Sequence, residues 1–154
     1  MIVNTSFIEQ NNLLPLNGLR VLLVDDNVDN LEIVGIILKE FSMSVMAATS
    51  AKQAREILMK WIPDILISDI AMPDEDGYSF IRSVRNLKDE KIKYIPAIAL
   101  TSVDLEEWRI LAFESGFQMY QVKPIDFNIL VTLIAQLAEQ ATTGTISPQS
   151  ETSV

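Results

Sequence analysis

Histidine and cysteine are both absent from this chain of 154 residues. Without cysteine there is no disulfide, no thiolate nucleophile and no zinc–thiolate centre. Without histidine there is no Ser-His-Asp triad, no histidine metal ligand and no phosphohistidine carried by the chain itself. Any chemistry in this sequence must therefore use carboxylates, hydroxyls, lysine or a bound metal ion.

Positive charge is also scarce, with 12 Lys and Arg against 21 Asp and Glu and a net charge of −9. Because affinity for a phosphate backbone needs clustered Lys and Arg, we expect no nucleic-acid partner. No apolar run approaches the roughly 18–20 residues that cross a bilayer. The first nineteen residues contain no Lys or Arg, which a secretory signal would need. We therefore expect a cytoplasmic protein with no membrane contact.

Short apolar runs alternate with longer amphipathic segments along the chain. The runs predict strands at 20–26, 44–48, 64–69, 96–102 and 119–123, and the segments predict helices at 29–41, 50–61, 77–87, 105–115 and 126–140. The charged segment 88–94 is predicted to be a loop. Strands that alternate with helices imply right-handed crossovers and a parallel sheet covered on both faces.

Local signals support these helices. In the first one, the predicted inward positions are Leu31, Val34, Ile37 and Leu38. Ser50 is a suitable N-cap for the second, and Gly116 is a suitable terminator for the fourth. The ends of the chain differ in composition, so we expect an extension at 1–17, one domain at 18–140 and a disordered Ser/Thr-rich tail at 141–154.

Polar residues stand where the predicted strands end. Asp25 and Asp26 follow the first strand, Asp69 the third, Thr101 the fourth and Lys123 the fifth. In an open parallel sheet, ligands bind outside the carboxyl ends of the strands at the point where strand order reverses. The five side chains should therefore converge in space.

Such a cluster of acids needs cations. Two carboxylates about 5 Å apart repel by roughly 3 kcal/mol at an effective dielectric constant near 20. Lys123 supplies one positive charge, and Mg²⁺ is favoured over zinc as a second because the chain has no His or Cys. A carboxylate beside Mg²⁺, a lysine and a threonine is equipped to become an aspartyl phosphate.

Four motifs in order then resemble the receiver domain of two-component response regulators. They are "VDD" at 24–26, "DIAMPDEDG" at 69–77, "ALTS" at 99–102 and "YQVKP" at 120–124, and the resemblance covers about residues 18–140. It implies a flavodoxin-like, doubly wound (βα)5 fold, an α/β fold with a five-stranded parallel sheet of order 2-1-3-4-5.

The resemblance also implies roles for the acids. Asp69 would accept a phosphoryl group from a phosphohistidine on a sensor histidine kinase or a histidine phosphotransfer protein. Asp26, Asp69 and the backbone carbonyl of Ala71 would bind Mg²⁺, and Asp25 would assist through water.

Other residues would stabilise the phosphoryl group and report its arrival. By the same resemblance, Lys123 would pair with phosphoryl oxygens, Thr101 would donate its hydroxyl, and Tyr120 would rotate in response. The Lys123–Pro124 peptide would be cis. The protein would be a signalling switch acting on a downstream protein effector, not an enzyme beyond its own phosphorylation and dephosphorylation.

The acids also have other interpretations. The run Asp74, Glu75 and Asp76 is best interpreted as an acidic turn before a helix, and a calcium loop does not fit its register. Haloacid-dehalogenase-like enzymes place a second acid where this chain has Ala71. A phosphate-independent interaction module is disfavoured by the complete set of acids, lysine and threonine. A role as an intermediate in a phosphorelay stays open.

The sequence differs from common receiver sequences at two places, and each difference leads to a prediction. Ala71 and Val103 stand where relatives often have polar side chains that orient the attacking water, so we predict slow self-dephosphorylation. Trp108 and Leu111 lie on a helix face that is usually charged in relatives. They are either ordinary surface apolar residues or an output surface that also serves a homodimer.

Overall fold

The computed structural model describes residues 16–143, which form one five-stranded sheet. Its order is β2-β1-β3-β4-β5 and every neighbouring pair is parallel, which confirms the predicted topology. The strands are β1 (Arg20–Val24), β2 (Ser44–Ala48), β3 (Ile65–Asp69), β4 (Ala97–Thr101) and β5 (Met119–Val122).

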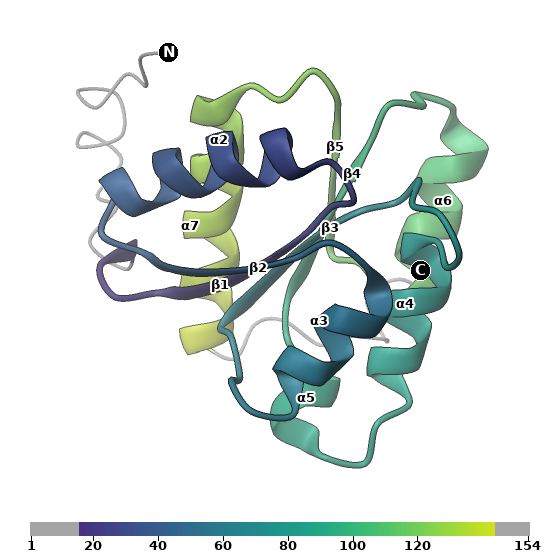
Figure 1. The fold of residues 1–154 in the computed structure, drawn as a ribbon, viewed down its shortest axis with the longest axis horizontal. Coiled ribbons are helices and arrows are strands. Elements are labelled where there is room, and N and C mark those ends of the chain that lie inside the picture. The colour runs from purple at the N-terminus through teal and green to yellow at the C-terminus, as the bar shows by residue number, and fades with distance from the viewer. Residues whose placement is uncertain (1–15, 144–154) are drawn as a thin grey trace.

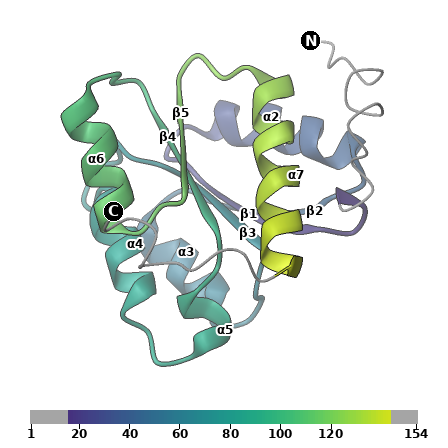
Figure 2. The ribbon, with the colours of Figure 1, turned by 180° about the vertical axis from the view of Figure 1, so that it is seen from behind.

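Helices cover both faces of this sheet (Figure 1). They are α2 (Val28–Glu40), α3 (Ala51–Leu58), α4 (Gly77–Arg85), α5 (Glu90–Lys93), α6 (Glu106–Ser115) and α7 (Phe127–Thr143). Seen from behind, α7 lies over one face with α2, while α6 and α4 lie on the other side (Figure 2). None of the helices in the described part of the chain is long and apolar enough to span a membrane.

The one-turn helix α5 corrects the predicted loop at 88–94. Its N-cap, Asp89, accepts a hydrogen bond of 2.9 Å from the backbone N–H of Lys91, and Ile92 is buried against the core. A single buried residue among charged ones produces no helical periodicity, so the pattern could not reveal this turn.

The central strands β1, β3 and β4 are buried on both sides, and successive residues of each face different cores. Val21 and Leu23 pack with α2 and α7, whereas Leu22 and Val24 pack with α3, α4 and α6. The predicted inward residues of α2 are all buried: Leu31, Val34, Ile37 and Leu38. This double burial explains why the strands are continuous apolar runs.

The predicted helix ends are also present. The Ser50 side chain accepts from the N–H of Gln53, and Gly116 follows α6 with a positive φ of 130°. Leu16 is only 1% exposed and packs in the core, although the predicted extension included it. Residues 1–15 of that extension and most of the predicted tail lie outside the described residues, so the domain limits remain predictions.

Candidate functional site

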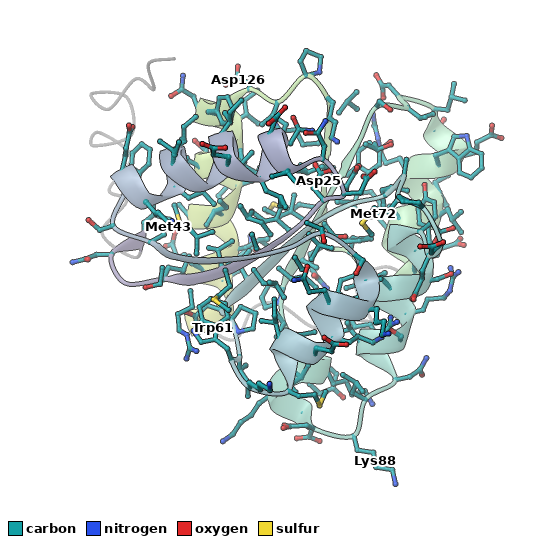
Figure 3. All side chains as sticks on the ribbon, viewed as in Figure 1. Asp25, Met43, Trp61, Met72, Lys88 and Asp126 are labelled. Carbon is teal, nitrogen blue, oxygen red and sulfur yellow. The ribbon has the colours of Figure 1, made fainter. Side chains whose placement is uncertain are left out.

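Three carboxylates meet at the carboxyl end of the sheet. β1 and β3 are neighbours because the strand order reverses between them, which places Asp25, just after β1, beside Asp69 at the end of β3. Ligand oxygens of Asp25, Asp26 and Asp69 lie within 4.8 Å of one another. Asp25 and Asp69 are each 5% exposed, whereas Asp26 is open to solvent. Figure 3 shows Asp25 beside the first turn of α2.

Lys123 joins two of these acids. Its Nζ lies 3.2 Å from Oδ2 of Asp69 and 3.4 Å from Oδ2 of Asp25. Its backbone N–H donates to the carbonyl of Thr101 at 2.7 Å, which ties the end of β5 to β4. The Lys123–Pro124 peptide is cis, as predicted.

The Asp69 carboxylate is held on both oxygens. Oδ1 accepts from the N–H of Ile70 at 2.9 Å, and Oδ2 faces Lys123. Burial, and secondarily the charge of Asp25, raise the pKa of Asp69 above its ordinary value, although Lys123 opposes this shift. A divalent cation among the acids would favour the ionised form. The donor set is entirely oxygen, which suits Mg²⁺.

Asp25 is held by residues that the sequence analysis missed. Its Oδ1 accepts from the backbone N–H of Asn27 at 2.9 Å, and its Oδ2 lies 3.4 Å from Nδ2 of Asn30. Asn27 is the N-cap of α2 and accepts from the N–H of Asn30. The sequence feature that could have indicated this contact is Asn30 in the first turn of the helix, at the position where Glu or Gln would complete a capping box.

Thr101 and Tyr120 both contact one backbone segment. Thr101 is 3% exposed, and its Oγ1 accepts from the N–H of Val103 at 3.1 Å. The Tyr120 hydroxyl donates to the carbonyl of the same Val103. The Tyr120 ring also lies 6.5 Å from the ring of Phe113, between centroids. The two predicted switch residues are therefore connected through the loop that precedes α6.

The acidic residues that follow Asp69 have different structural roles. Asp76 caps α4 by accepting from the N–H of Ser79 at 2.8 Å, as an acidic turn predicts. Glu75 instead makes a two-pronged ion pair with Arg55 of α3, with both N–O distances at 2.7 Å. Sequence reasoning missed this pair. Asp74 has a φ of 70°, which an aspartate tolerates better than most residues.

The same loop passes very close to the end of β3. The N–H of Gly77 donates to the carbonyl of Ile70 at 2.8 Å. A Cβ at Gly77 would lie 2.5 Å from the carbonyl oxygen of Asp69, so only glycine fits here. Ala71, the predicted carbonyl ligand, is exposed in this loop.

The predicted interface residues lie on α6. Trp108 is 40% exposed and stacks on Tyr78 of α4, with 6.2 Å between ring centroids and 21° between planes. Leu111 is only partly exposed. An open surface groove along the helix is lined by Glu107, Trp108, Ile110, Leu111 and Glu114. The two residues therefore share one surface.

Comparisons with known proteins agree with this geometry. The family model of the response regulator receiver domain matches residues 21–135. The chain belongs to this family. Over 116 residues it is 40% identical to an uncharacterised 14.6 kDa protein of Leptolyngbya boryana, with 75% of this chain and 87% of that protein covered. It is 35% identical over 116 residues to the sensor histidine kinase CheAY of Helicobacter pylori, where the match covers 74% of this chain and 14% of the kinase.

Solved structures show the same fold. A putative response regulator from Chloroflexus aurantiacus has a TM-score of 0.74 at 28% identity, with 80% of this chain and 99% of that chain covered. The chemotaxis response regulator CheY4 of Vibrio cholerae has a TM-score of 0.72 at 26% identity, with 79% and 99% covered. The match covers half or less of the length of most of the longer relatives. Their similarity therefore concerns the receiver domain and not the activities of those whole proteins.

Proposed function

We propose that this receiver accepts a phosphoryl group on Asp69 from a phosphohistidine of a sensor histidine kinase or a histidine phosphotransfer protein. A carboxylate oxygen of Asp69 attacks phosphorus, the P–N bond breaks, and the imidazole nitrogen leaves with the bonding electrons and takes a proton from solvent. The observation that carries the proposal is the buried Asp69 carboxylate with Lys123 at 3.2 Å and two further acids within 4.8 Å.

The acids would also hold Mg²⁺. Asp26, Asp69 and the backbone carbonyl of Ala71 are the proposed ligands, and Asp25 would assist through water. When bound, the ion neutralises negative charge on the transferring phosphoryl group. Lys123 pairs with a phosphoryl oxygen, which requires only that its ammonium turn from the carboxylates it already contacts.

Arrival of the phosphoryl group would then shift a conformational equilibrium. Thr101 donates its hydroxyl to the phosphoryl group, and movement of its side chain toward that group strains the hydrogen bond that Oγ1 accepts from the N–H of Val103. Because Tyr120 bonds the carbonyl of the same residue, movement of that loop repositions Tyr120 as well. The Tyr120 ring lies near that of Phe113 on α6, the helix that also carries Trp108 and Leu111.

We propose that this α6 surface is the output face, where a downstream protein effector or a second copy of the receiver binds in the cytoplasm. Its apolar centre is flanked by Glu107 and Glu114, the arrangement of a hydrophobic patch with a polar rim. Sedimentation with and without beryllofluoride tests the dimer. A monomer in both conditions would exclude the dimer and leave an effector as the partner of this surface. A pull-down with beryllofluoride should then recover that effector, and the Trp108→Ala variant should not bind it.

A hydrolytic enzyme with an aspartate nucleophile is less consistent with the site. Haloacid-dehalogenase-like enzymes of this kind place an acid two residues after the nucleophile, and the residue there is Ala71. The signalling function therefore explains more of the site than turnover of a small phosphorylated substrate.

Incubation with a small phosphodonor tests the proposal directly. With Mg²⁺, the wild type should gain one phosphoryl group, and Asp69→Asn should gain none. Asp74→Asn is the matched control, since it removes an exposed acid of the same loop and should label normally. Labelling that persists in Asp69→Asn, or that proceeds equally in EDTA, would overturn the assignment.

A further inference from the structure

Asn30 has an unusual position for its residue type. It is the third residue of α2, after the N-cap Asn27, and its own backbone N–H donates to the Asn27 side chain at 3.1 Å. In a capping box the side chain at this position returns to the N–H of the N-cap. Here that N–H donates to Oδ1 of Asp25 at 2.9 Å instead. The amide of Asn30 is thereby left to point at the other oxygen of Asp25, 3.4 Å away.

The result is a closed arrangement that fixes the direction of one carboxylate. Oδ1 of Asp25 is held by Asn27, while Oδ2 is shared between the Asn30 amide and the Lys123 ammonium, each at 3.4 Å. Within the described structure, loss of the amide would leave the Lys123 ammonium as the remaining partner of Oδ2. The carboxylate could then turn toward Lys123 and compete with Asp69 for it.

Among the described residues, no other side chain on this side of Asp25 can replace that amide. A small pocket of about 10 Å³, partly open to solvent, borders Asp25, and within the described structure Asp25 and Asn30 contribute its polar side chains. The remaining wall is apolar, formed by Leu23, Val24, Leu31, Val34, Ile67 and Leu100. An Asp25 oxygen that lost Asn30 would face hydrocarbon on this side, where an unpaired carboxylate oxygen is unfavourable.

From this geometry, and resting on the proposed phosphoacceptor function, we propose that Asn30 is a positioning residue for Mg²⁺ binding: it orients Asp25 toward the acidic cluster and leaves Lys123 available to Asp69. Partners that orient metal-binding carboxylates typically contribute about 10-fold or more to metal affinity. Asn30 itself touches neither the ion nor the phosphoryl group in this role.

The test is Mg²⁺ titration by calorimetry of the full chain as wild type, Asn30→Leu and Asn30→Gln. Asn30→Leu removes the donor and approximates the volume, and its better helix propensity offsets part of the stability lost with the hydrogen bond to Asp25. Its Mg²⁺ affinity should be weaker by roughly 10-fold, and its rise in melting temperature on adding Mg²⁺ should be correspondingly smaller. Asn30→Gln retains an amide and should restore part of the affinity.

Asn86→Leu serves as the control, because its amide donates to the carbonyl of Arg82 at the C-terminal end of α4. It should lower stability without changing Mg²⁺ affinity. Equal Mg²⁺ affinity of Asn30→Leu and the wild type would overturn the inference while leaving Asp69 phosphorylation intact. If the wild type itself took up neither Mg²⁺ nor a phosphoryl group, the proposed function would fail as well. If Asn30→Leu does not fold, Asn30→Ala takes its place: an Mg²⁺ affinity below those of the wild type and Asn30→Gln supports the inference, and an affinity equal to that of the wild type overturns it.

Discussion

Lys123 Nζ lies 3.2 Å from Oδ2 of Asp69 and is shared with Asp25 at 3.4 Å. One ammonium thus serves two buried carboxylates, with Asp26 exposed beside them. Without a divalent ion the site has excess negative charge, in keeping with the raised pKa of Asp69. The apo receiver therefore keeps an electrostatically unfavourable site, which should cost it folding stability.

The first prediction concerns that cost. Asp69→Asn removes one of two repelling carboxylates and preserves an oxygen for the N–H of Ile70. In EDTA at pH 7 the variant should be more stable than the wild type by about 1–2 kcal/mol, a part of the roughly 3 kcal/mol repulsion that Lys123 does not offset. Urea unfolding measures the difference. Addition of Mg²⁺ should reverse the order, and a variant less stable than the wild type in EDTA would contradict the prediction.

The second prediction concerns the ion pair between Arg55 and Glu75. The hydrogen bonds and charge of Arg55 lower the pKa of Glu75. A depressed carboxyl pKa stabilises the fold above the unfolded value near 4.5, and this stabilisation is lost as pH falls through the folded value. Both side chains are about one-third exposed, so we expect Arg55→Met to lose only about 0.5–1 kcal/mol at pH 7.

Urea denaturation at several pH values checks this pair. The difference between wild type and Arg55→Met should shrink as pH falls below about 4.5. Asp74→Asn is the matched control from the same acidic run, and its unfolding free energy at pH 7 should stay within about 0.5 kcal/mol of the wild type. A difference for Arg55→Met that persists unchanged in acid would show that lost packing, not charge, explains it.

The fold and the acidic cluster could be predicted because both depend on order along the chain. Strands buried on both faces are continuous apolar runs, and residues that end parallel strands meet at one edge whatever their separation in sequence. Asp25, Asp69 and Lys123 are brought together by this rule alone. Detailed side-chain directions were not needed.

Contacts that depend on side-chain direction could not be predicted. Arg55 and Glu75 are 20 residues apart on a helix and a loop, and no periodic pattern relates them. The contact of Asn30 with Asp25 also depends on the direction of a side chain, which an asparagine in the first turn of a helix does not reveal. The one-turn α5 was missed for a related reason, since a single buried Ile92 carries too little pattern to reveal a helix.

The third prediction concerns Arg85, which the sequence did not single out. Its guanidinium is 2% exposed and donates to the carbonyls of Gly116 at 2.8 Å and Lys93 at 2.8 Å. Burial lowers its pKa to about 10, so it stays charged at neutral pH. It thereby joins the end of α4 to the ends of α5 and α6.

Arg85→Met should therefore lose roughly 3 kcal/mol of unfolding free energy in urea, because the buried carbonyl of Gly116 and the part-buried carbonyl of Lys93 both lose a charged donor. Arg82→Met is the matched control on the same helix. Arg82 is exposed and donates to the hydroxyl of Ser115 at 3.0 Å, so its loss should cost less than about 1 kcal/mol. Similar losses for the two variants would show that the carbonyls of Gly116 and Lys93 do not depend on Arg85.

The last prediction concerns the lifetime of the phosphorylated state. Ala71 and Val103 are both exposed beside the site, and neither side chain can orient or deprotonate an attacking water. Ala71→Asn or Val103→Gln should therefore accelerate loss of the phosphoryl group by roughly 10-fold, less than a fully positioned general base supplies. Val103→Leu stays apolar and should leave the rate unchanged, which separates polarity from altered packing against Thr101 and Tyr120. The decay of labelled protein after removal of the phosphodonor gives each rate. A wild-type half-life of a few seconds at room temperature would contradict the prediction, because it would require an efficient route to water that these two residues do not provide.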